Sequence, residues 1–522
     1  MSTRRPNFLM ISTDQQRADH LGCYGANLLQ TPNIDGLALL GTRYENAYVA
    51  SPVCMPNRAS LVTGRMPSVH GVRHNGLNLD LGSMTFAEAL RQAGWRTSLS
   101  GKPHFQCVTQ NPAPMTKCQD AATTPEARCS TKGHYDQELG QLWHDHTDRT
   151  MQLPYYGFEE VDLAVGHGDI VDGHYTAWLR DQGCDPDALR GAENALDDAG
   201  QETIQAWRTA VPEELYPTRF IQNATIERLR SYAKTPETPF FHWASFCDPH
   251  HPFTPPGKYW DMYKPEDVEL PPSFQAERGS DFVQSLMQSR KNEEANLAGT
   301  SAIAVSEQEL RVALALTYGM IAMVDDAVGD IMSALTALGL AEDTIVIFLS
   351  DHGDLMGEHG LLFKGPYHYR GMIRTPLIWA DPKASKSQVI STPVSAIDVA
   401  ATILETASIA PFNGMQGQPF KDHAGNDVAA RDAILIEDEI QSDLAGHNVR
   451  GRVRTLLSDG WRLTIYDGLE QGEFYNLNED PHELNNLWNL PQAAARRADM
   501  TEQMLREMLC HTETSPLPIY SA

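Results

Sequence analysis

Positive charge is scarce in this sequence. Its 522 residues include 41 Lys and Arg against 68 Asp and Glu, so the formal net charge is −27. Nucleic-acid binders gain most of their affinity from clustered Lys and Arg, so this composition excludes a general nucleic-acid partner. Solubility is the simplest role for the acidic excess.

Long apolar runs and paired cysteines are also missing. No stretch approaches the roughly 20 apolar residues that a membrane span needs. The apolar run that follows the basic N-terminus, Phe8 to Ile11, is too short for the hydrophobic core of a secretory signal. The eight cysteines form no CxxC pair. We therefore expect a reduced, cytoplasmic protein with no membrane partner.

The chain has no internal repeat and no low-complexity tract. Its hydrophobic content of 41% and charged content of 21% are typical of a globular protein. At about 150 residues per domain the length suggests roughly three domains, although large α/β enzymes often keep one long sheet in a single unit. The chain is long enough to bury a sizeable core.

Four short apolar runs share one feature, which is that each ends abruptly in polar residues capable of chemistry. Continuous apolar runs are typical of strands buried on both faces, and helical patterns such as Phe86–Ala93, Phe220–Ala233 and Leu314–Leu338 lie between them. This alternation predicts an α/β fold with a large, mainly parallel sheet. Ligands bind beyond the carboxyl ends of such strands, where the four clusters should meet. The runs are Asn7–Ile11 before Asp14-Gln15, Trp95–Ser100 before Gly101-Lys102-Pro103-His104, Phe240–Phe246 before Asp248-Pro249-His250-His251, and Thr344–Ser350 before Asp351-His352-Gly353.

The last part of the chain has a different pattern. Polar stretches at about 106–150, 181–215 and 255–310 read as insertions that shape the substrate pocket. After a helical stretch at Asp398–Leu404, the segment Pro411–Pro419 reads as a linker. We predict a catalytic α/β domain over 1–425 and a smaller antiparallel C-terminal subdomain over 426–522. Its expected strands are Ala433–Ile436, Arg454–Leu457, Trp461–Tyr466 and Glu473–Leu477, with a hairpin turn at Ser458-Asp459-Gly460.

The most specific motif is Cys54-Met55-Pro56-Asn57-Arg58. Pro56 suits the first turn of a helix and Gly64 its end, so Cys54 should lie at a helix N-terminus. The helix dipole stabilises negative charge there, and Arg58 adds a cation one turn along. A lone cysteine is more often a small buried hydrophobe, but the CxPxR spacing favours a nucleophile.

With these motifs the sequence resembles the sulfatase family of the alkaline-phosphatase superfamily, whose members convert the cysteine of CxPxR to formylglycine. The resemblance implies an alkaline-phosphatase-like sheet sandwiched by helices, and hydrolysis of aryl or alkyl sulfate esters to an alcohol and sulfate. Some features are shared with the phosphonate monoester hydrolase and choline sulfatase branches. The likeness covers Asn7–Arg17, Thr31–Gly76, Gly101–His104, Pro249–Pro252, Tyr318–Trp379 and Gly472–Leu487.

Two adjacent pairs at two strand ends, Asp14-Gln15 and Asp351-His352, predict a site for one divalent metal ion. Oxygen ligands suit Ca²⁺, Mg²⁺ or Mn²⁺, and the imidazole shifts the preference toward Mn²⁺ or a later transition metal. Helix capping would explain Asp14 or Asp351 alone but not both together. The commonest family pattern has Asp in place of Gln15 and Asn in place of His352, so the identity of the metal, Mn²⁺ or Ca²⁺, stays open.

Further site residues follow only from the resemblance. Lys102 and His104 match the family's GKxH element, and Lys364 matches its second active-site lysine; both ammonium groups would hold sulfate oxygens. His250 would protonate the leaving alcohol, with His251 as its rival. Asn75 is a candidate for contacting the anion. We expect His144 and His146 to face solvent or line the pocket, and His167 and His174 to have structural or solvent-facing roles.

The implied mechanism begins when a separate formylglycine-generating enzyme oxidises Cys54, and the aldehyde is hydrated to a gem-diol. One hydroxyl, activated by the metal and Arg58, attacks sulfur while His250 protonates the departing alcohol. The second hydroxyl then loses its proton, with His104 as one candidate acceptor, and expels sulfate.

Two alternatives remain. The first is a phosphonate monoester or phosphodiester hydrolase with the same nucleophile, and the second is a non-catalytic anion-binding module. The sequence also leaves open whether the chain forms a homo-oligomer.

Overall fold

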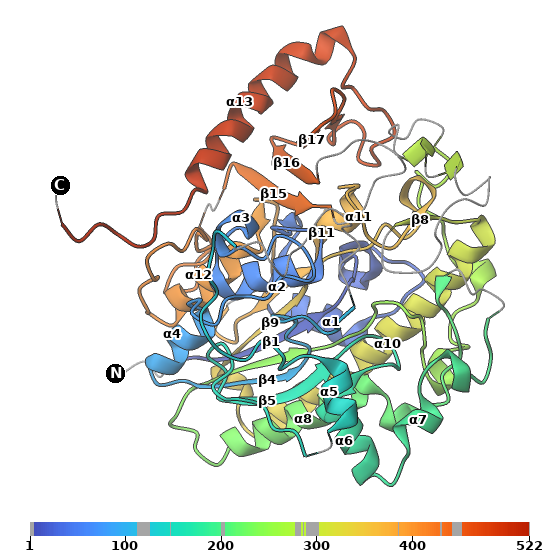
Figure 1. Cartoon of the computed structure of the whole chain (residues 1–522), viewed down its shortest axis with the longest axis vertical. Coiled ribbons are helices and arrows are strands. Elements are labelled where there is room, and N and C mark those ends of the chain that lie inside the picture. Colours follow the sequence, from blue (N-terminus) through green and yellow to red (C-terminus); the bar gives the residue numbers. More distant parts are fainter. Residues whose placement is uncertain are drawn as a thin grey trace.

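A central sheet with helices on both faces forms the body of the protein, and a second, smaller sheet with a long helix lies at one end (Figure 1). The computed structural model describes residues 5–111, 126–146, 148–199, 204–276, 283–285, 287–288, 302–384, 386–428, 431–440 and 451–520.

Within these ranges the central sheet has nine strands, and its middle strands run parallel. Strands β12 and β6 run antiparallel to their neighbours. The predicted mainly parallel sheet is confirmed. In spatial order the strands are β13 (Gln388–Ile390), β2 (Thr42–Tyr44), β12 (Leu377–Ala380), β9 (Thr344–Ser350), β1 (Asn7–Thr13), β7 (Phe240–Ser245), β4 (Arg96–Gly101), β5 (Glu160–Val165) and β6 (Asp172–Gly173).

Strand β1 is apolar from Phe8 to Ile11. Every residue of β1 is buried, because both faces of the sheet are covered. Phe8 and Met10 pack into the core under α2 (Cys54–Thr63), α4 (Phe86–Gln92) and α12 (Ile397–Thr406). Leu9 and Ile11 point to the other face, into the core under the helices α1 (Pro32–Leu40), α6 (His174–Asp181), α8 (Pro217–Tyr232) and α10 (Glu307–Ala337). Each buried side chain of this size contributes about 1.5–3 kcal/mol to folding.

Helix α10 is the longest helix in the described part of the chain. A capping box starts it, in which the Ser306 hydroxyl accepts from the Glu309 N–H and the Glu309 carboxylate accepts from the Ser306 N–H. The helix is long and apolar enough to cross a membrane, but 78% of its most apolar window is buried inside the protein. It therefore has the environment of a core helix.

The C-terminal strands form the predicted antiparallel sheet, in the order β15 (Ala433–Glu439), β16 (Arg452–Ser458), β17 (Trp461–Tyr466) and β18 (Glu473–Asn476). Helix α13 (Ala494–Cys510) contacts the strands β15, β16 and β17 of this sheet. Glu437 on β15 accepts hydrogen bonds from the backbone N–H and hydroxyl of Ser68, at 2.7 and 2.9 Å, and so ties this sheet to the catalytic part. The boundary at 425/426 stays a prediction.

Short elements complete the described fold. Two small sheets pair β11 (Arg374–Thr375), β3 (Ala47–Tyr48) and β14 (Val394–Ser395), and β10 (Leu361–Leu362) with β8 (Ile303–Ala304). The remaining α-helices are α3 (Pro67–His70), α5 (Gly140–Asp145), α7 (Pro186–Leu189) and α11 (Arg370–Ile373).

The loops after the central strands continue the sheet's hydrogen bonding and thereby converge. The N–H of Asp14 donates to the Asp248 carbonyl at 3.2 Å, and the N–H of Lys102 donates to the Ser245 carbonyl at 3.0 Å. The N–H of Asp351 donates to the Thr13 carbonyl at 3.2 Å. The four predicted clusters therefore meet at one edge of the sheet.

Candidate active site

Cys54 begins helix α2, as predicted. The helix ends at Gly64, whose φ of 63° is the left-handed conformation that glycine adopts most easily, and whose N–H bonds the Ser60 carbonyl. Asn57 fixes the start of the helix, because its side-chain oxygen accepts from the Ala50 N–H at 2.8 Å and its amide donates to the Asp351 carbonyl. Cys54 is therefore held rigidly against the Asp351 loop.

The predicted metal-ligand residues come together around Cys54. One ligand atom from each of Asp14, Cys54, Asp351 and His352 lies within 4.8 Å of the others, and all four residues are buried. The Nδ1–H of His352 donates to the Gly353 carbonyl at 2.7 Å. The Nε2 lone pair therefore faces the Asp14 and Asp351 carboxylates, at 3.6 and 3.9 Å. This donor set fits a divalent cation.

Gln15 lies beside this group in a strained backbone conformation, with φ at 64°. Its side-chain oxygen accepts from the Lys364 ammonium at 2.9 Å, and its amide donates to Asp354. The amide orientation leaves the oxygen on the side of the nucleophile, where a metal ligand would be needed.

Arg58 is fully buried and lies between the carboxylates of Asp14 and Asp351. Its Nε donates to Asp351 at 2.7 Å, and its Nη1 donates to the Lys102 carbonyl and the Ser245 hydroxyl at 2.6 and 2.9 Å. Its Nη2 lies 3.6 Å from Asp14 and has no hydrogen-bond partner among the described residues. This N–H group is a ready donor to an incoming anion.

Two buried lysines flank the nucleophile. The Lys364 ammonium lies 3.2 Å from the Cys54 sulfur, and the Lys102 ammonium donates to Asp14. Burial raises the pKa of Asp14, but Lys102 and Arg58 outweigh it and hold that pKa well below its ordinary value. Burial and Asp14 raise the pKa of the Cys54 thiol, yet Lys364, His352 and Lys102 together bring it below its usual value.

The two adjacent histidines face different groups. The Nε2 of His250 lies 2.6 Å from the Lys364 ammonium, while its Nδ1 donates to the His251 carbonyl. The Nδ1 of His251 instead accepts from the Gln15 amide at 3.1 Å, and its ring packs on Phe363 at 4.0 Å between centroids. His250 thus faces Lys364, and His251 faces the side-chain amide of Gln15.

His104 and Asn75 lie at the edge of the cluster. His104 is buried, and burial together with the Lys102 charge holds its pKa well below the ordinary value, so its ring is neutral. The Asn75 side-chain oxygen accepts from the Met55 N–H at 3.1 Å, next to Cys54. The proposed contact between Asn75 and the anion stays a prediction.

The structure corrects our expectation for His167, which we assigned a structural or solvent-facing role. It follows β5, and its Nε2 lies 2.6 Å from the Lys102 ammonium and 3.8 Å from Asp14. Its ring stacks on His250, with 3.6 Å between centroids and 15° between planes. The sequence analysis did not place His167 in the cluster, because Glu160–Val165 alternates polar and apolar residues and its end was not recognised as a strand end. The Gly-His-Gly that follows it was the available signal.

Glu138 is a second residue that the sequence analysis missed. Its carboxylate accepts from three successive backbone N–H groups, those of His104, Phe105 and Gln106, at 2.7, 2.8 and 3.0 Å. The hydroxyl of Tyr155 donates to it at 2.6 Å. It is fully buried and has no ion-pair partner within the described ranges. The insertion at 106–150 therefore anchors the loop that carries Lys102 and His104.

The other histidines lie apart from the cluster, as expected. His144 pairs with Asp187 at 2.8 Å, and His146 is exposed. The Nδ1 of His174 accepts from the Leu163 N–H at 3.0 Å.

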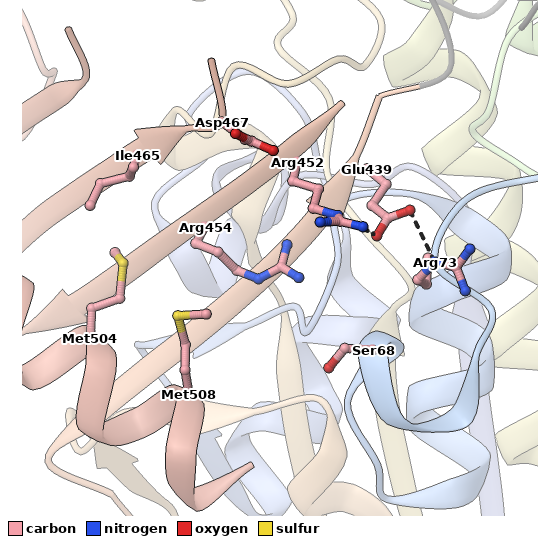
Figure 2. A pocket seen from close by; sticks show the side chains of 9 residues that line it. All are labelled: Ser68, Arg73, Glu439, Arg452, Arg454, Ile465, Asp467, Met504 and Met508. Atoms are coloured by element: carbon pink, nitrogen blue, oxygen red, sulfur yellow. Dashed lines mark hydrogen bonds and ion pairs between the residues drawn. The ribbon is translucent and has the colours of Figure 1, made fainter. Parts of the chain in front are cut away.

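A cavity of about 630 Å³ lies elsewhere, between α3, the C-terminal sheet and α13 (Figure 2). Met504 and Met508 from α13 face Arg454 across it, and Glu439 pairs with Arg73 at 3.0 Å. None of its lining residues belongs to the cluster around Cys54.

The parallel sheet and the buried cluster of nucleophile, carboxylates, lysines and histidines at its edge define a hydrolase of anionic esters. The sulfatase family model matches residues 6–409, and the model of the N-sulphoglucosamine sulphohydrolase C-terminal region matches residues 357–509. The chain belongs to the sulfatase family and is a sulfuric ester hydrolase.

Relatives of known activity are similar over nearly the whole chain. An arylsulfatase of Clostridium perfringens is 28% identical, and the match covers 97% of this chain and 94% of the relative. A choline-sulfatase of Rhizobium meliloti is 27% identical, with 96% and 86% covered. The crystal structure of the phosphonate monoester hydrolase of Agrobacterium radiobacter superposes with a TM-score of 0.75 at 26% identity, over 98% of this chain and 97% of that one.

Proposed function

We propose that this sulfatase hydrolyses aryl or alkyl sulfate esters through Cys54 in its formylglycine form. One observation carries the proposal: the Cys54 sulfur lies 3.0 Å from the Nε2 of His352 and 3.2 Å from the Lys364 ammonium. The Cys54 sulfur thus lies between an imidazole nitrogen that can bind a metal ion and an ammonium group. A hydrated aldehyde at this position would supply two hydroxyls on one carbon, one to attack sulfur and one to expel sulfate.

Asp14, Gln15, Asp351 and His352 would hold one divalent cation, which supplies Lewis-acid activation of the nucleophile and of the sulfate group. The orientation of the His352 lone pair and the paired carboxylates support this assignment. The imidazole favours Mn²⁺, while the oxygen ligands are equally suited to Ca²⁺.

The remaining groups are placed to act on the ester itself. The Lys102 and Lys364 ammonium groups and the Arg58 Nη2 would bind the non-bridging sulfate oxygens, where negative charge accumulates in the transition state. The Nε2 of His250, which accepts from the Lys364 ammonium, would pass a proton from that ammonium to the leaving oxygen, and neutral His104 would accept one when sulfate departs.

The active form is tested by peptide mass spectrometry of protein produced with a formylglycine-generating enzyme. We expect the aldehyde at Cys54 and activity that rises in proportion to conversion. Cys54→Ala should fold normally and lose nearly all turnover, whereas Cys510→Ala, at an exposed position on α13, should behave as wild type. Full activity in protein that carries only the unmodified thiol would disprove the proposed nucleophile.

Elemental analysis tests the metal site. Asp14→Ala and Asp351→Ala should lose bound metal and activity together. His352→Asn should keep a site but shift its preference from Mn²⁺ toward Ca²⁺, because an imidazole is replaced by a hard oxygen ligand. Stoichiometric metal in both alanine variants would show that these carboxylates serve only as structural caps.

A phosphonate monoester or phosphodiester hydrolase is the second candidate. The likeness to the Agrobacterium radiobacter enzyme favours it, as do Gln15 and His352 in the ligand set. A kinetic panel of aryl sulfate, alkyl sulfate, phosphonate monoester and phosphodiester separates the two, and we expect the highest kcat/KM for a sulfate ester.

The cytoplasm is the compartment that we propose. In its support, the seven cysteines that the described ranges contain are all free thiols. Localisation of a tagged chain by cell fractionation tests this proposal.

A further inference from the structure

His167 occupies a position that the proposed chemistry has not used. Its side chain is 19% exposed, while those of Lys102 and Asp14 are fully buried. It is therefore more exposed to solvent than the two residues that it contacts.

The loop that carries His167 is built to hold it there. Gly168 has φ at 51°, and a Cβ on it would lie 2.7 Å from the Pro252 carbonyl oxygen and 2.8 Å from the Thr254 hydroxyl. The Asp169 N–H donates to that same hydroxyl at 3.0 Å. The His167 loop is thus fastened to the segment that follows His250, and the two rings keep a fixed relation.

The first contact of His167 concerns Lys102. An ammonium group can only donate hydrogen bonds, so the Nε2 of His167 must accept from it, at 2.6 Å. Asp14 accepts from the same ammonium. Without His167, the positive charge of Lys102 would be directed at Asp14 alone, and its geometry toward a sulfate oxygen would be lost.

The second contact concerns His250. The planes of the two rings are nearly parallel, with 15° between them, and the ring centroids are 3.6 Å apart. His251 packs on His250 as well, at 4.2 Å between centroids and 26° between planes. Rotation of the His250 ring is therefore restricted, and its Nε2 keeps one direction.

We propose that His167 is a positioning residue for sulfate ester hydrolysis: it sets the Lys102 ammonium through its Nε2, and it sets the plane of His250 through ring stacking. The inference rests on the roles proposed above for Lys102 and His250. Each of the two contacts can be removed separately, so the test can distinguish the effect on Lys102 from the effect on His250.

Three variants of the matured enzyme separate the contacts. His167→Phe keeps a ring over His250 but cannot accept from Lys102, so KM and the inhibition constant of inorganic sulfate should rise about ten-fold with little change in leaving-group dependence. His167→Gln keeps an acceptor but no ring, so sulfate inhibition should stay near wild type. Its rate should fall more for alkyl sulfates than for nitrophenyl sulfate, by about ten-fold. His167→Ala should show both effects.

Metal content and thermal unfolding of each variant are measured alongside, and both should match wild type. His144→Ala serves as the control. His144 lies in the insertion at about 106–150, away from the cluster, and this variant should have wild-type kinetics. Lys102→Ala and His250→Ala define the full effect at each contact. Equal losses in all three His167 variants, on every substrate and with unchanged sulfate inhibition, would show a merely structural role. Wild-type kinetics in His167→Ala, beside impaired Lys102→Ala and His250→Ala, would overturn the inference. Unimpaired Lys102→Ala and His250→Ala would instead overturn the roles on which it rests.

Discussion

At the scale of single residues, the loop Lys102 to Gln106 depends on one carboxylate. His104 has φ at 55°, a conformation that a non-glycine residue keeps only when its surroundings enforce it. Glu138 supplies that enforcement through backbone N–H groups, with no cation beside it in the described ranges, and burial raises its pKa. The geometry of the Lys102–Gln106 loop therefore depends on two oxygens that both accept hydrogen bonds, and of the side chains only a carboxylate offers two such oxygens on one group.

Glu138→Gln should lower kcat by about 10²-fold, because an amide N–H would oppose backbone N–H groups and shift the loop that carries Lys102 and His104. Steady-state kinetics on nitrophenyl sulfate measure this loss. Glu159→Gln, at an exposed position, is the control and should keep wild-type rates. Unchanged kcat in Glu138→Gln would show that the loop holds its shape without this carboxylate.

The roles of His250 and His251 are distinguished by leaving-group dependence. A proton matters most when the departing oxygen is a poor leaving group, so His250→Ala should steepen the dependence of rate on leaving-group pKa. The expected loss is roughly 10²–10⁴-fold on the poorest leaving groups. His251→Ala should lower all rates evenly, through its contact with Gln15. A series of substituted phenyl sulfates provides the measurement, and the reverse pattern would exchange the two assignments.

At the scale of elements, the central strands that carry the site were predictable from the sequence. The outer strands β2 and β13 were not. Strands β1, β7 and β9 are mostly apolar because both faces are buried, whereas β4 (Arg96–Gly101) is buried although most of its residues are polar. By contrast, β2 and β13 have three residues each, and their pairing is set by distant segments rather than by local pattern. The pairs Asp14-Gln15 and Asp351-His352 were singled out because they end recognisable strands, and Glu138 was missed because no periodicity marks it.

The C-terminal sheet is joined to the site by a buried ionic group. Arg462 on β17 is fully buried, lies 3.0 Å from Glu473 and also pairs with Glu483. The other oxygen of Glu483 accepts from the Arg370 N–H at 2.8 Å, at the start of α11 and close in sequence to Lys364. This group links the position of the small sheet to the segment that carries Lys364.

Arg462→Met should lower the free energy of unfolding by about 3–5 kcal/mol, because two carboxylates would remain buried without their cation. Arg496→Met, which removes an exposed pair with Asp459, should cost at most about 1 kcal/mol. Urea unfolding followed by tryptophan fluorescence compares the two variants. Equal costs would mean that the Arg462 group is not a stabilising link.

At the scale of the whole molecule, several histidines are buried in neutral form. Burial lowers the pKa of His70 and of His242 to about 3, and that of His20 and of His359 to about 4. Their unfolded-state pKa is about 6.5. Below that pH the unfolded chain binds more protons than the folded one, so stability is present above pH 6.5 and is lost as the pH falls toward 3.

Each of these histidines should cost about 2 kcal/mol of stability between pH 8 and pH 5. Burial also raises the pKa of Asp248 and of Glu483 to about 7, and these carboxyls add stability as the pH falls over the same range, so the histidine contribution is measured by comparing variants with wild type. His242→Gln should flatten the curve by one histidine's share, since it removes a group held between Ser98 and Thr225. His423→Gln, whose side chain is 72% exposed, should leave the slope unchanged. A His242→Gln curve with the same pH dependence as wild type would contradict the assignment of a neutral buried ring at His242.

The burial of Cys54 has a consequence for the order of events during biosynthesis. Its side chain is 1% exposed, and the groups that enclose it come from positions as far apart as Asp14 and Lys364. Under the proposed maturation, the oxidising enzyme must reach the sulfur before these segments close around it. Oxidation of Cys54 therefore competes with folding of the chain. The fraction of active molecules in a cell then depends on the rate of oxidation relative to the rate of folding.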